Sequence, residues 1–207
     1  MNSIASVTLE VADTTAADRF YAAFGLAAQV RLRPSEAPTT GFRGFALALT
    51  VSRPADVNVF VDAALAAGAT PLKPAKKSFW GYGATVQAPD GTIWKIATSE
   101  KKDTGPATRR IDEMVLLLGV EDVIASKKFY VDRGLAVAKS FGSKYVQFDT
   151  PSAPVQLALY GRRALAKEVG VPADGTGSHR LMLGSSAGSF TDPDGFAWEA
   201  TSLTATH

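Results

Sequence analysis

The chain has 207 residues, 46% of them hydrophobic, so it can bury a substantial core as one large or two small domains. Its 22 Lys and Arg residues against 20 Asp and Glu give a formal net charge of +2, which provides no basic footprint for nucleic acid. The absence of cysteine excludes disulfides, thiolate catalysis and cysteine-ligated metal. No apolar run reaches membrane-spanning length and the first four residues lack the basic start of a signal peptide, so we expect a soluble cytoplasmic protein without a membrane partner.

The first half of the chain predicts short strands and two amphipathic helices. Residues 4–11 alternate between apolar and polar side chains, which is typical of a half-buried strand. Asp13 or Thr14 can then cap a helix whose apolar stripe runs from Ala17 to Phe24 and which Gly25 ends. Further elements expected here are strands at 27–32, 45–51, 79–83 and 93–98, a helix over 57–67, and a loop over 34–44.

A charged stretch at 99–110, which contains Gly105-Pro106, is the best linker in the chain. The second half then repeats the pattern with changes. We expect strands at 114–120, 137–141, 145–148, 155–160 and 180–183, a helix over 123–133, and a short helix over 162–169. Near the end, Gly184 to Gly188 stands where the first half has a helix and a strand, so the last unit is predicted to be truncated.

Two motifs occur twice and indicate an internal duplication. Val11-Ala12-Asp13 before Phe20-Tyr21 is matched 109 positions later by Val120-Glu121-Asp122 before Phe129-Tyr130. Pro89-Asp90-Gly91, followed by Trp94-Lys95, is matched 104 positions later by Pro193-Asp194-Gly195, followed by Trp198-Glu199. Pro, Asp and Gly in this order favour a tight turn into a strand. The chain is therefore predicted to consist of two related halves, residues 1–104 and 105–207.

These motifs, together with Trp80-Gly81-Tyr82, resemble the vicinal oxygen chelate superfamily, which includes glyoxalase I, bleomycin-resistance proteins and extradiol dioxygenases. The resemblance implies an α+β fold of duplicated βαβββ modules, in which curved mixed sheets form cups and helices cover the outer faces. It also implies that the two halves of one chain pack as a pseudo-dimer. The protein is then expected to be either a monomer with this internal pseudo-dimer or a homodimer. Some family dimers exchange modules; with exchange, one cup would join Ser6, Met182 and Glu199 and the other Val115, Ala46 and Lys95. Without exchange, each half would make its own cup.

Family enzymes hold one divalent metal in the cup, such as Fe, Mn, Ni, Co or Zn, on His and carboxylate ligands. The matched positions here are expected to be Ser6, Val115, Ala46, Met182, Lys95 and Glu199, and only Glu199 is a plausible ligand. A fallback metal site would combine Glu113, His179 and Glu199, with a strand bulge bringing the first two inward. The alternative is that Glu113 is a solvated strand end and His179 a loop residue.

The other candidates are assigned by strand alternation. Trp94 and Trp198 point away from Lys95 and Glu199, so we expect both indoles in the core. Trp80 and Tyr82 could be aromatic walls for a flat organic ligand, or could equally pack within a hairpin or between the halves. Because Ser6 and Thr8 lie on the polar face of the first strand, they are candidate binding residues.

Three functions follow from these assignments. The first is a metal-free protein that binds a small organic molecule in a cup lined by the residues Ser6, Thr8, Trp80, Tyr82, Lys95 and Glu199. The second is a metal-dependent lyase, isomerase or dioxygenase, and the third is a metal-free enzyme with Glu199 or Lys95 as acid or base. We favour the first, and expect the larger pocket to be lined by first-half residues that include Trp80 or Tyr82, with the cup around Val115 smaller or filled.

Overall fold

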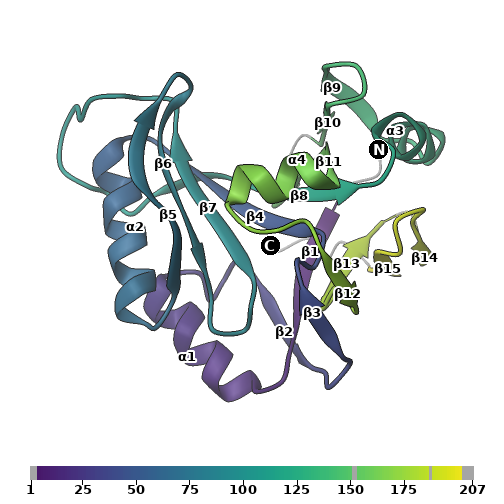
Figure 1. The fold of residues 1–207 in the computed structure, drawn as a ribbon, viewed down its shortest axis with the longest axis horizontal. Coiled ribbons are helices and arrows are strands. Elements are labelled where there is room, and N and C mark those ends of the chain that lie inside the picture. Colours follow the sequence, from purple (N-terminus) through teal and green to yellow (C-terminus); the bar gives the residue numbers. More distant parts are fainter. Residues whose placement is uncertain (1–3, 151–152, 187, 202–207) are drawn as a thin grey trace, which may run out of the picture.

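The computed structural model describes residues 4–150, 153–186 and 188–201. It contains a five-stranded sheet, an eight-stranded sheet and a two-stranded ribbon, with strand orders β14-β15-β13-β1-β2, β5-β6-β7-β4-β8-β11-β10-β9 and β12-β3. No helix among the described residues is long and apolar enough to cross a membrane. The architecture is the expected α+β arrangement, with curved sheets and few helices (Figure 1).

The eight-stranded sheet combines one module from each half of the chain. The first is β4–α2–β5–β6–β7 and the second is β8–α3–β9–β10–β11, and they meet where β4 pairs antiparallel with β8. The bounds of these elements are β4 (Phe45–Val51), α2 (Pro54–Ala66), β5 (Thr70–Ser78), β6 (Gly81–Gln87), β7 (Ile93–Thr98), β8 (Ile111–Val120), α3 (Val123–Asp132), β9 (Ala136–Ser140), β10 (Tyr145–Asp149) and β11 (Gln156–Gly161).

The five-stranded sheet combines the two remaining modules, from opposite ends of the chain. β1 pairs antiparallel with β13, with Thr8 opposite Met182, so the first and last modules share a sheet. The structure therefore has the exchanged arrangement, which the sequence left open beside an arrangement in which each half makes its own cup. The remaining elements are β1 (Ile4–Val11), α1 (Thr14–Phe24), β2 (Arg31–Pro34), β3 (Thr39–Gly41), α4 (Arg162–Val169), β12 (Gly175–Gly177), β13 (Leu181–Ser185), β14 (Phe190–Thr191) and β15 (Ala197–Ala200).

Several elements differ from the predicted ones. The second strand begins at Arg31 rather than Ala27, because residues 27–29 form a turn. The loop predicted over 34–44 contains β3, which pairs with β12 from the segment that follows α4. β5 was not predicted, since its Pro71 and Pro74 argue against a central strand, and it lies at the edge of the sheet, where proline is tolerated. Residues 99–110 are the predicted linker, and they are tied to α2 because the buried Asp56 carboxylate accepts hydrogen bonds from Thr108 N and Arg109 N.

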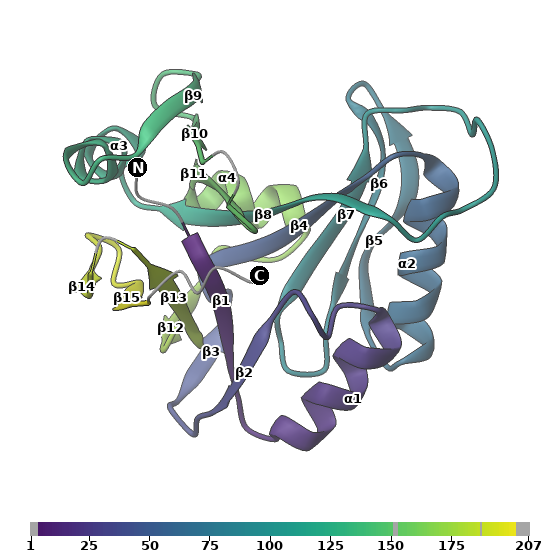
Figure 2. The ribbon, with the colours of Figure 1, turned by 180° about the vertical axis from the view of Figure 1, so that it is seen from behind.

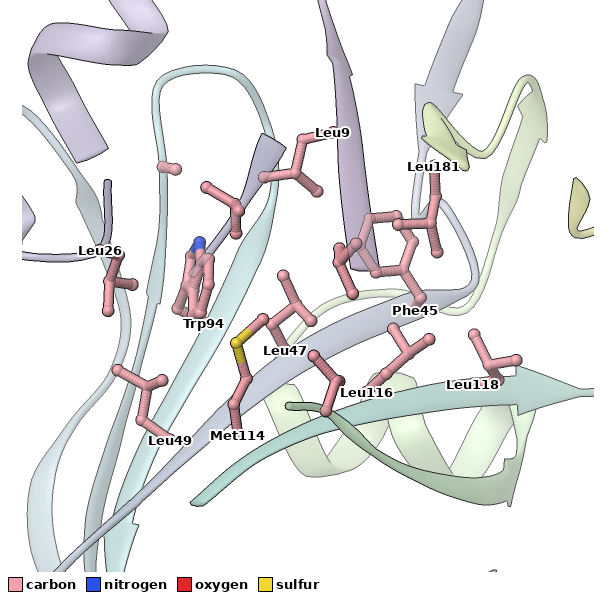
Figure 3. Close-up of a cluster of buried hydrophobic side chains, with 14 of the residues drawn as sticks. Leu9, Leu26, Phe45, Leu47, Leu49, Trp94, Met114, Leu116, Leu118 and Leu181 are labelled. Atoms are coloured by element: carbon pink, nitrogen blue, oxygen red, sulfur yellow. The ribbon is translucent and has the colours of Figure 1, made fainter. Parts of the chain in front are cut away.

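The main core lies between the two sheets. Figure 3 shows Leu9 of β1 and Leu181 of β13 facing side chains of β4 and β8, including Leu47 and Leu116. Trp94 and Trp198 are both buried, as the alternation predicted. Figures 1 and 2 show α2 along the outer side of the arm formed by β5, β6 and β7, with α1 next to one end of α2 and running toward β2.

Both Pro-Asp-Gly turns are anchored by a helix tyrosine. The Tyr21 hydroxyl donates to Asp90 at 2.7 Å, and the Tyr130 hydroxyl donates to Asp192, two residues before Asp194. Burial, reinforced by the neighbouring carboxylate, raises the pKa of each tyrosine well above its usual value, and burial also raises the pKa of Asp192. The duplicated motif thus fixes the helix against the strand that carries the charged residue.

Candidate functional site

A cavity of about 940 Å³ lies on the concave face of the eight-stranded sheet. Its walls come from β5, β6 and β7 on one side and from β9, β10 and β11 on the other, with α4 at its floor. Figure 1 shows α4 in the bend of the sheet, between these two arms. We name this concave face the open cup.

Strand alternation places Lys95 in the open cup. Lys95 pairs with Thr85 across β6 and β7, and both residues line the cavity. Trp94, the preceding residue, points to the opposite side and is fully buried in the core. The charged residue after the duplicated tryptophan is therefore directed toward the cavity in this module, as expected.

Helix α4 fills part of the cup floor. Its apolar side chains Leu165, Ala166 and Val169 are buried in a second cluster with Ala46 and Val115 of the sheet. The space directly over Val115 is filled by these side chains, but the prediction that the cup around Val115 is smaller or filled is wrong, because the same cup holds the cavity. The filled floor and the cavity nevertheless belong to one cup, whose lining comes from both halves rather than from the first half alone.

The C-terminal end of α4 is fixed by a lysine of β5. Lys73 Nζ donates to the carbonyl oxygens of Lys167 at 2.8 Å and Glu168 at 2.6 Å. These are terminal helix carbonyls, which lack partners within the helix and attract a cation. Gly170, with φ of 90°, ends the helix in the left-handed conformation, and a Cβ there would lie 3.0 Å from Lys73 Cγ.

Lys95 and Glu168 form an ion pair on the cavity wall, between Lys95 Nζ and Glu168 Oε1. The two side chains are 28% and 44% exposed, so water reaches both partners. The pair links β7 to α4 and presents an acid and a base to the same cavity.

Two tyrosines form the opposite wall. The rings of Tyr145 and Tyr160 meet edge to face, with centroids 4.8 Å apart. Burial, with smaller contributions from Tyr145 and Glu168, raises the pKa of Tyr160 to about 12, and burial raises the pKa of Tyr145 as well. Both phenols therefore stay protonated at neutral pH and can donate hydrogen bonds.

The five-stranded sheet has a different concave face, which we name the bridged cup. Arg33 of β2 donates to Glu10 of β1 at 2.5 Å and to Glu199 of β15 at 2.8 Å. Because β1 and β13 lie between β2 and β15, the Arg33–Glu199 pair crosses two strands, so the sheet must curve to bring its sides together. These hydrogen bonds, that of Glu10 most strongly, raise the pKa of Arg33.

Ser6 and Thr8 lie on the same face of β1 as Glu10, with Ser6 opposite Gly184 and Gly184 beside Glu199. The predicted binding set is thus divided between two sheets. Ser6, Thr8 and Glu199 belong to the bridged cup, whereas Lys95 and Trp80 belong to the open cup. A single cup lined by all of them is not formed, because module exchange separates β1 from β7.

The two aromatic residues of the β5–β6 hairpin also separate. Trp80 is 83% exposed at the hairpin tip and borders the cavity. Tyr82 lies at the cavity edge, but it pairs with the buried Thr98 and its hydroxyl donates to Asn58 of α2 at 2.8 Å. Trp80 is therefore a cavity residue, while the phenol of Tyr82 contacts the outer helix.

The fallback metal residues do not come together. Glu113 lies on β8 in the eight-stranded sheet, and Glu199 lies on β15 in the five-stranded sheet, paired with Arg33. His179 stacks on Phe196 with centroids 3.9 Å apart, and each ring nitrogen contacts a backbone carbonyl, of Arg43 or Asp194. Within the described part of the chain, no three His, Asp or Glu residues are placed to hold a metal.

The metal position of the open cup is likewise occupied by unsuitable groups. Ala46 and Val115 have no donor atoms, and the Lys95 ammonium is a cation already paired with Glu168. The residues present therefore do not fit the divalent metal that the resemblance implies.

Sequence reasoning missed Tyr145, Tyr160 and Glu168 as cavity residues. Strand alternation offered a signal for Tyr160, since Gln156, Ala158 and Tyr160 pair with residues on the Val115 face of β8. No signal existed for Glu168, because an amphipathic helix can be read from its sequence but the surface that it covers cannot.

Solved structures share this fold. The chain is similar to glyoxalase I from Zea mays, with a TM-score of 0.60 and 15% identity over 96% of this chain and 91% of that one. A V278E mutant of the same enzyme gives a TM-score of 0.64 and 15% identity, over 99% of this chain and 93% of that one. The chain has a glyoxalase-like fold.

A third structure supports this fold. A putative dioxygenase from Bacillus subtilis gives a TM-score of 0.54 and 12% identity over 88% of this chain and 69% of that one. No protein-family model and no curated protein matches the sequence. At these identities the glyoxalase-like likeness concerns the fold, and the function has to be argued from the cups themselves.

Proposed function

We propose that the protein binds a small organic molecule in the open cup without a bound metal. The observation that carries this proposal is the cavity of about 940 Å³, which falls within the usual size of small-molecule sites. Its wall offers the Tyr145–Tyr160 pair, Trp80 at the rim and the Lys95–Glu168 pair. The side chains at the expected metal position, Ala46, Val115 and the paired Lys95, are unsuitable ligands for a divalent ion, and this supports binding without a metal.

Tryptophan fluorescence can test this proposal. Of the three tryptophans, Trp94 and Trp198 are buried and Trp80 is exposed beside the cavity. A library of small organic molecules should yield compounds that change the emission of the wild type but not that of Trp80→Phe. Equilibrium dialysis should give the same dissociation constant with and without a chelator. Stoichiometric Fe, Mn, Ni, Co or Zn that survives dialysis and is needed for binding would overturn the proposal.

A metal-free enzyme is a second candidate, favoured by the direct contact of Lys95 with Glu168 beside Tyr160. An acid and a base in one cavity are the groups that proton transfer needs. Any bound compound should be followed by mass spectrometry for conversion. Conversion that is lost in Lys95→Met and Glu168→Gln while binding persists would favour the enzyme, and no conversion in the wild type would favour simple binding.

A further inference from the structure

Exposed aromatic side chains occur at both hairpin tips that flank the open cup. At the β5–β6 tip, Phe79 and Trp80 are 81% and 83% exposed and meet edge to face with centroids 4.9 Å apart. At the β9–β10 tip, the Phe141 side chain is 64% exposed, and its ring centroid lies 6.0 Å from that of Tyr145. Trp80 and Phe141 both border the cavity. Large aromatic groups left in water beside a cavity are typical of a binding site.

The inner wall continues this aromatic surface. Tyr145 connects Phe141 at the rim to Tyr160 deeper in the cavity, through ring contacts on both sides. Trp80 lies on the opposite arm of the sheet. A flat ring system that enters between the arms would contact the faces and edges of aromatic side chains. Such ring–ring contacts are more favourable than burial of the same area alone.

Cations outnumber anions around the cavity. Four lysines line it, Lys73, Lys76, Lys95 and Lys144, against the carboxylate of Glu168. The Glu113 carboxylate lies near enough to Tyr145 to raise the pKa of that phenol, in addition to the larger effect of burial. Lys95 is paired with Glu168, and Lys73 is held by helix carbonyls. Lys76 and Lys144 have no ion-pair partner among the described residues, so the mouth of the cavity carries uncompensated positive charge.

The two uncompensated lysines lie on opposite arms of the cup. Lys76 pairs with Gly83 of β6, whose face also carries the cavity residues Thr85 and Lys95. Lys144 lies in the β9–β10 turn beside Phe141. An anion at the mouth would therefore meet positive charge from both sides, in a concave site that strengthens the local potential.

We propose that the ligand of the open cup is a planar aromatic molecule carrying an acidic group, such as a carboxylate or sulfonate. Its rings pack between Trp80 and the Phe141–Tyr145–Tyr160 wall, and its acidic group faces Lys76 and Lys144. This assignment rests on the proposed binding function and adds the chemical class of the ligand.

A matched pair of fluorescent probes tests the assignment. 1-Anilinonaphthalene-8-sulfonate and N-phenyl-1-naphthylamine share the same rings, and only the first carries the sulfonate. The sulfonate probe should bind at least about fivefold more tightly at low salt, and the difference should shrink in high salt. The double variant Lys76→Gln/Lys144→Gln should lose this preference and leave the affinity for the neutral probe unchanged.

Matched variants separate the possible results. Arg19→Gln/Lys128→Gln removes the same charge from outer helices α1 and α3 and should change neither affinity. If Trp80→Ala weakens both probes but the sulfonate gives no advantage, or if the lysine variant behaves like the control, the acidic-ligand assignment is wrong and cup binding stands. If neither probe binds, or Trp80→Ala changes neither affinity, the proposed cup binding itself is wrong.

Discussion

The open cup and the bridged cup follow one strand plan but treat the same charged position differently. In the open cup, Lys95 reaches across to Glu168 on a helix, and a cavity remains beside the pair. In the bridged cup, the corresponding Glu199 of β15 pairs with Arg33 of β2, across the two strands that lie between them. A duplicated backbone therefore fixes where a side chain points, while its partner decides whether the cup is spanned or left accessible.

The source of the partner explains the difference. Glu168 belongs to α4, which follows β11 and covers only part of the concave face, over Val115 and Leu117. Arg33 belongs to β2 of the five-stranded sheet itself, so its ion pairs run across that face. Substitutions on either side of this contrast should differ in their effects, and the largest effect is expected at the floor of the open cup.

The first prediction concerns the helix on the cup floor. Leu165→Ala removes a fully buried side chain from α4 and should lower the free energy of unfolding by about 2–5 kcal/mol. Chemical denaturation measures this loss. The exposed Arg163→Ala on the same helix is the control and should stay within about 0.5 kcal/mol of wild type. A similarly small loss in Leu165→Ala would contradict the packing of α4 on the floor.

The second prediction uses the two members of the open-cup ion pair. Glu168→Gln frees Lys95 and should tighten binding of the sulfonate probe by about threefold to tenfold, whereas Lys95→Met should weaken it by a similar factor. Fluorescence titration compares the two variants. Shifts of the same sign would show that the charge of Lys95 does not act on the ligand.

The third prediction breaks the bridged cup. Arg33→Met leaves Glu10 and Glu199 without their shared cation, and should cost about 0.5–1 kcal/mol because the groups are partly exposed and screened. The loss should diminish in high salt, as followed by thermal unfolding. Arg31→Met on the same strand is the control. Probe binding in the open cup should be unchanged, and a large loss of binding would connect the two cups.

The fourth prediction is spectroscopic. Burial raises the pKa of Tyr160 to about 12, above the usual value of 10.0, so the folded protein holds this proton more strongly than the unfolded chain. The resulting stabilisation is complete below pH 10 and is lost as the pH rises toward 12. The tyrosinate absorbance of wild type minus that of Tyr160→Phe should therefore have its midpoint near 12. A midpoint near 10 would place this phenol in open solvent.

Local signals in the sequence predicted much of the fold. Asp13, one of the two predicted caps, caps the first helix through a side-chain hydrogen bond, and Asp122 at the matching position of the second half does the same. The Pro-Asp-Gly turns also have the expected conformation, with φ of 89° at Gly91 and 88° at Gly195. Caps and turns depend on neighbours in the chain, so a sequence can specify them directly.

The cavity depended on contacts that are distant in the chain. The pairing of Lys95 with Glu168 and the meeting of Trp80 with Tyr160 around one cavity arise only after two modules join and α4 folds into the bend. For Tyr82 the sequence left a cavity wall and packing within the hairpin equally open, and the residue borders the cavity while its hydroxyl binds Asn58 of α2. Which residues line the cavity therefore depends on how the modules and α4 pack, and local sequence patterns do not specify that packing.

The pairing of β1 with β13 also has a consequence for biosynthesis. On the ribosome, β4 through α4 are made as one continuous stretch, so every strand of the open cup has emerged by the time its floor is complete. Leu9, in contrast, pairs with Leu181 near the far end of the chain. The edge of β1 that pairs with β13 therefore stays without its partner until synthesis reaches β13, and this edge needs shielding from other nascent chains. Vectorial synthesis thus completes the open cup before the bridged cup.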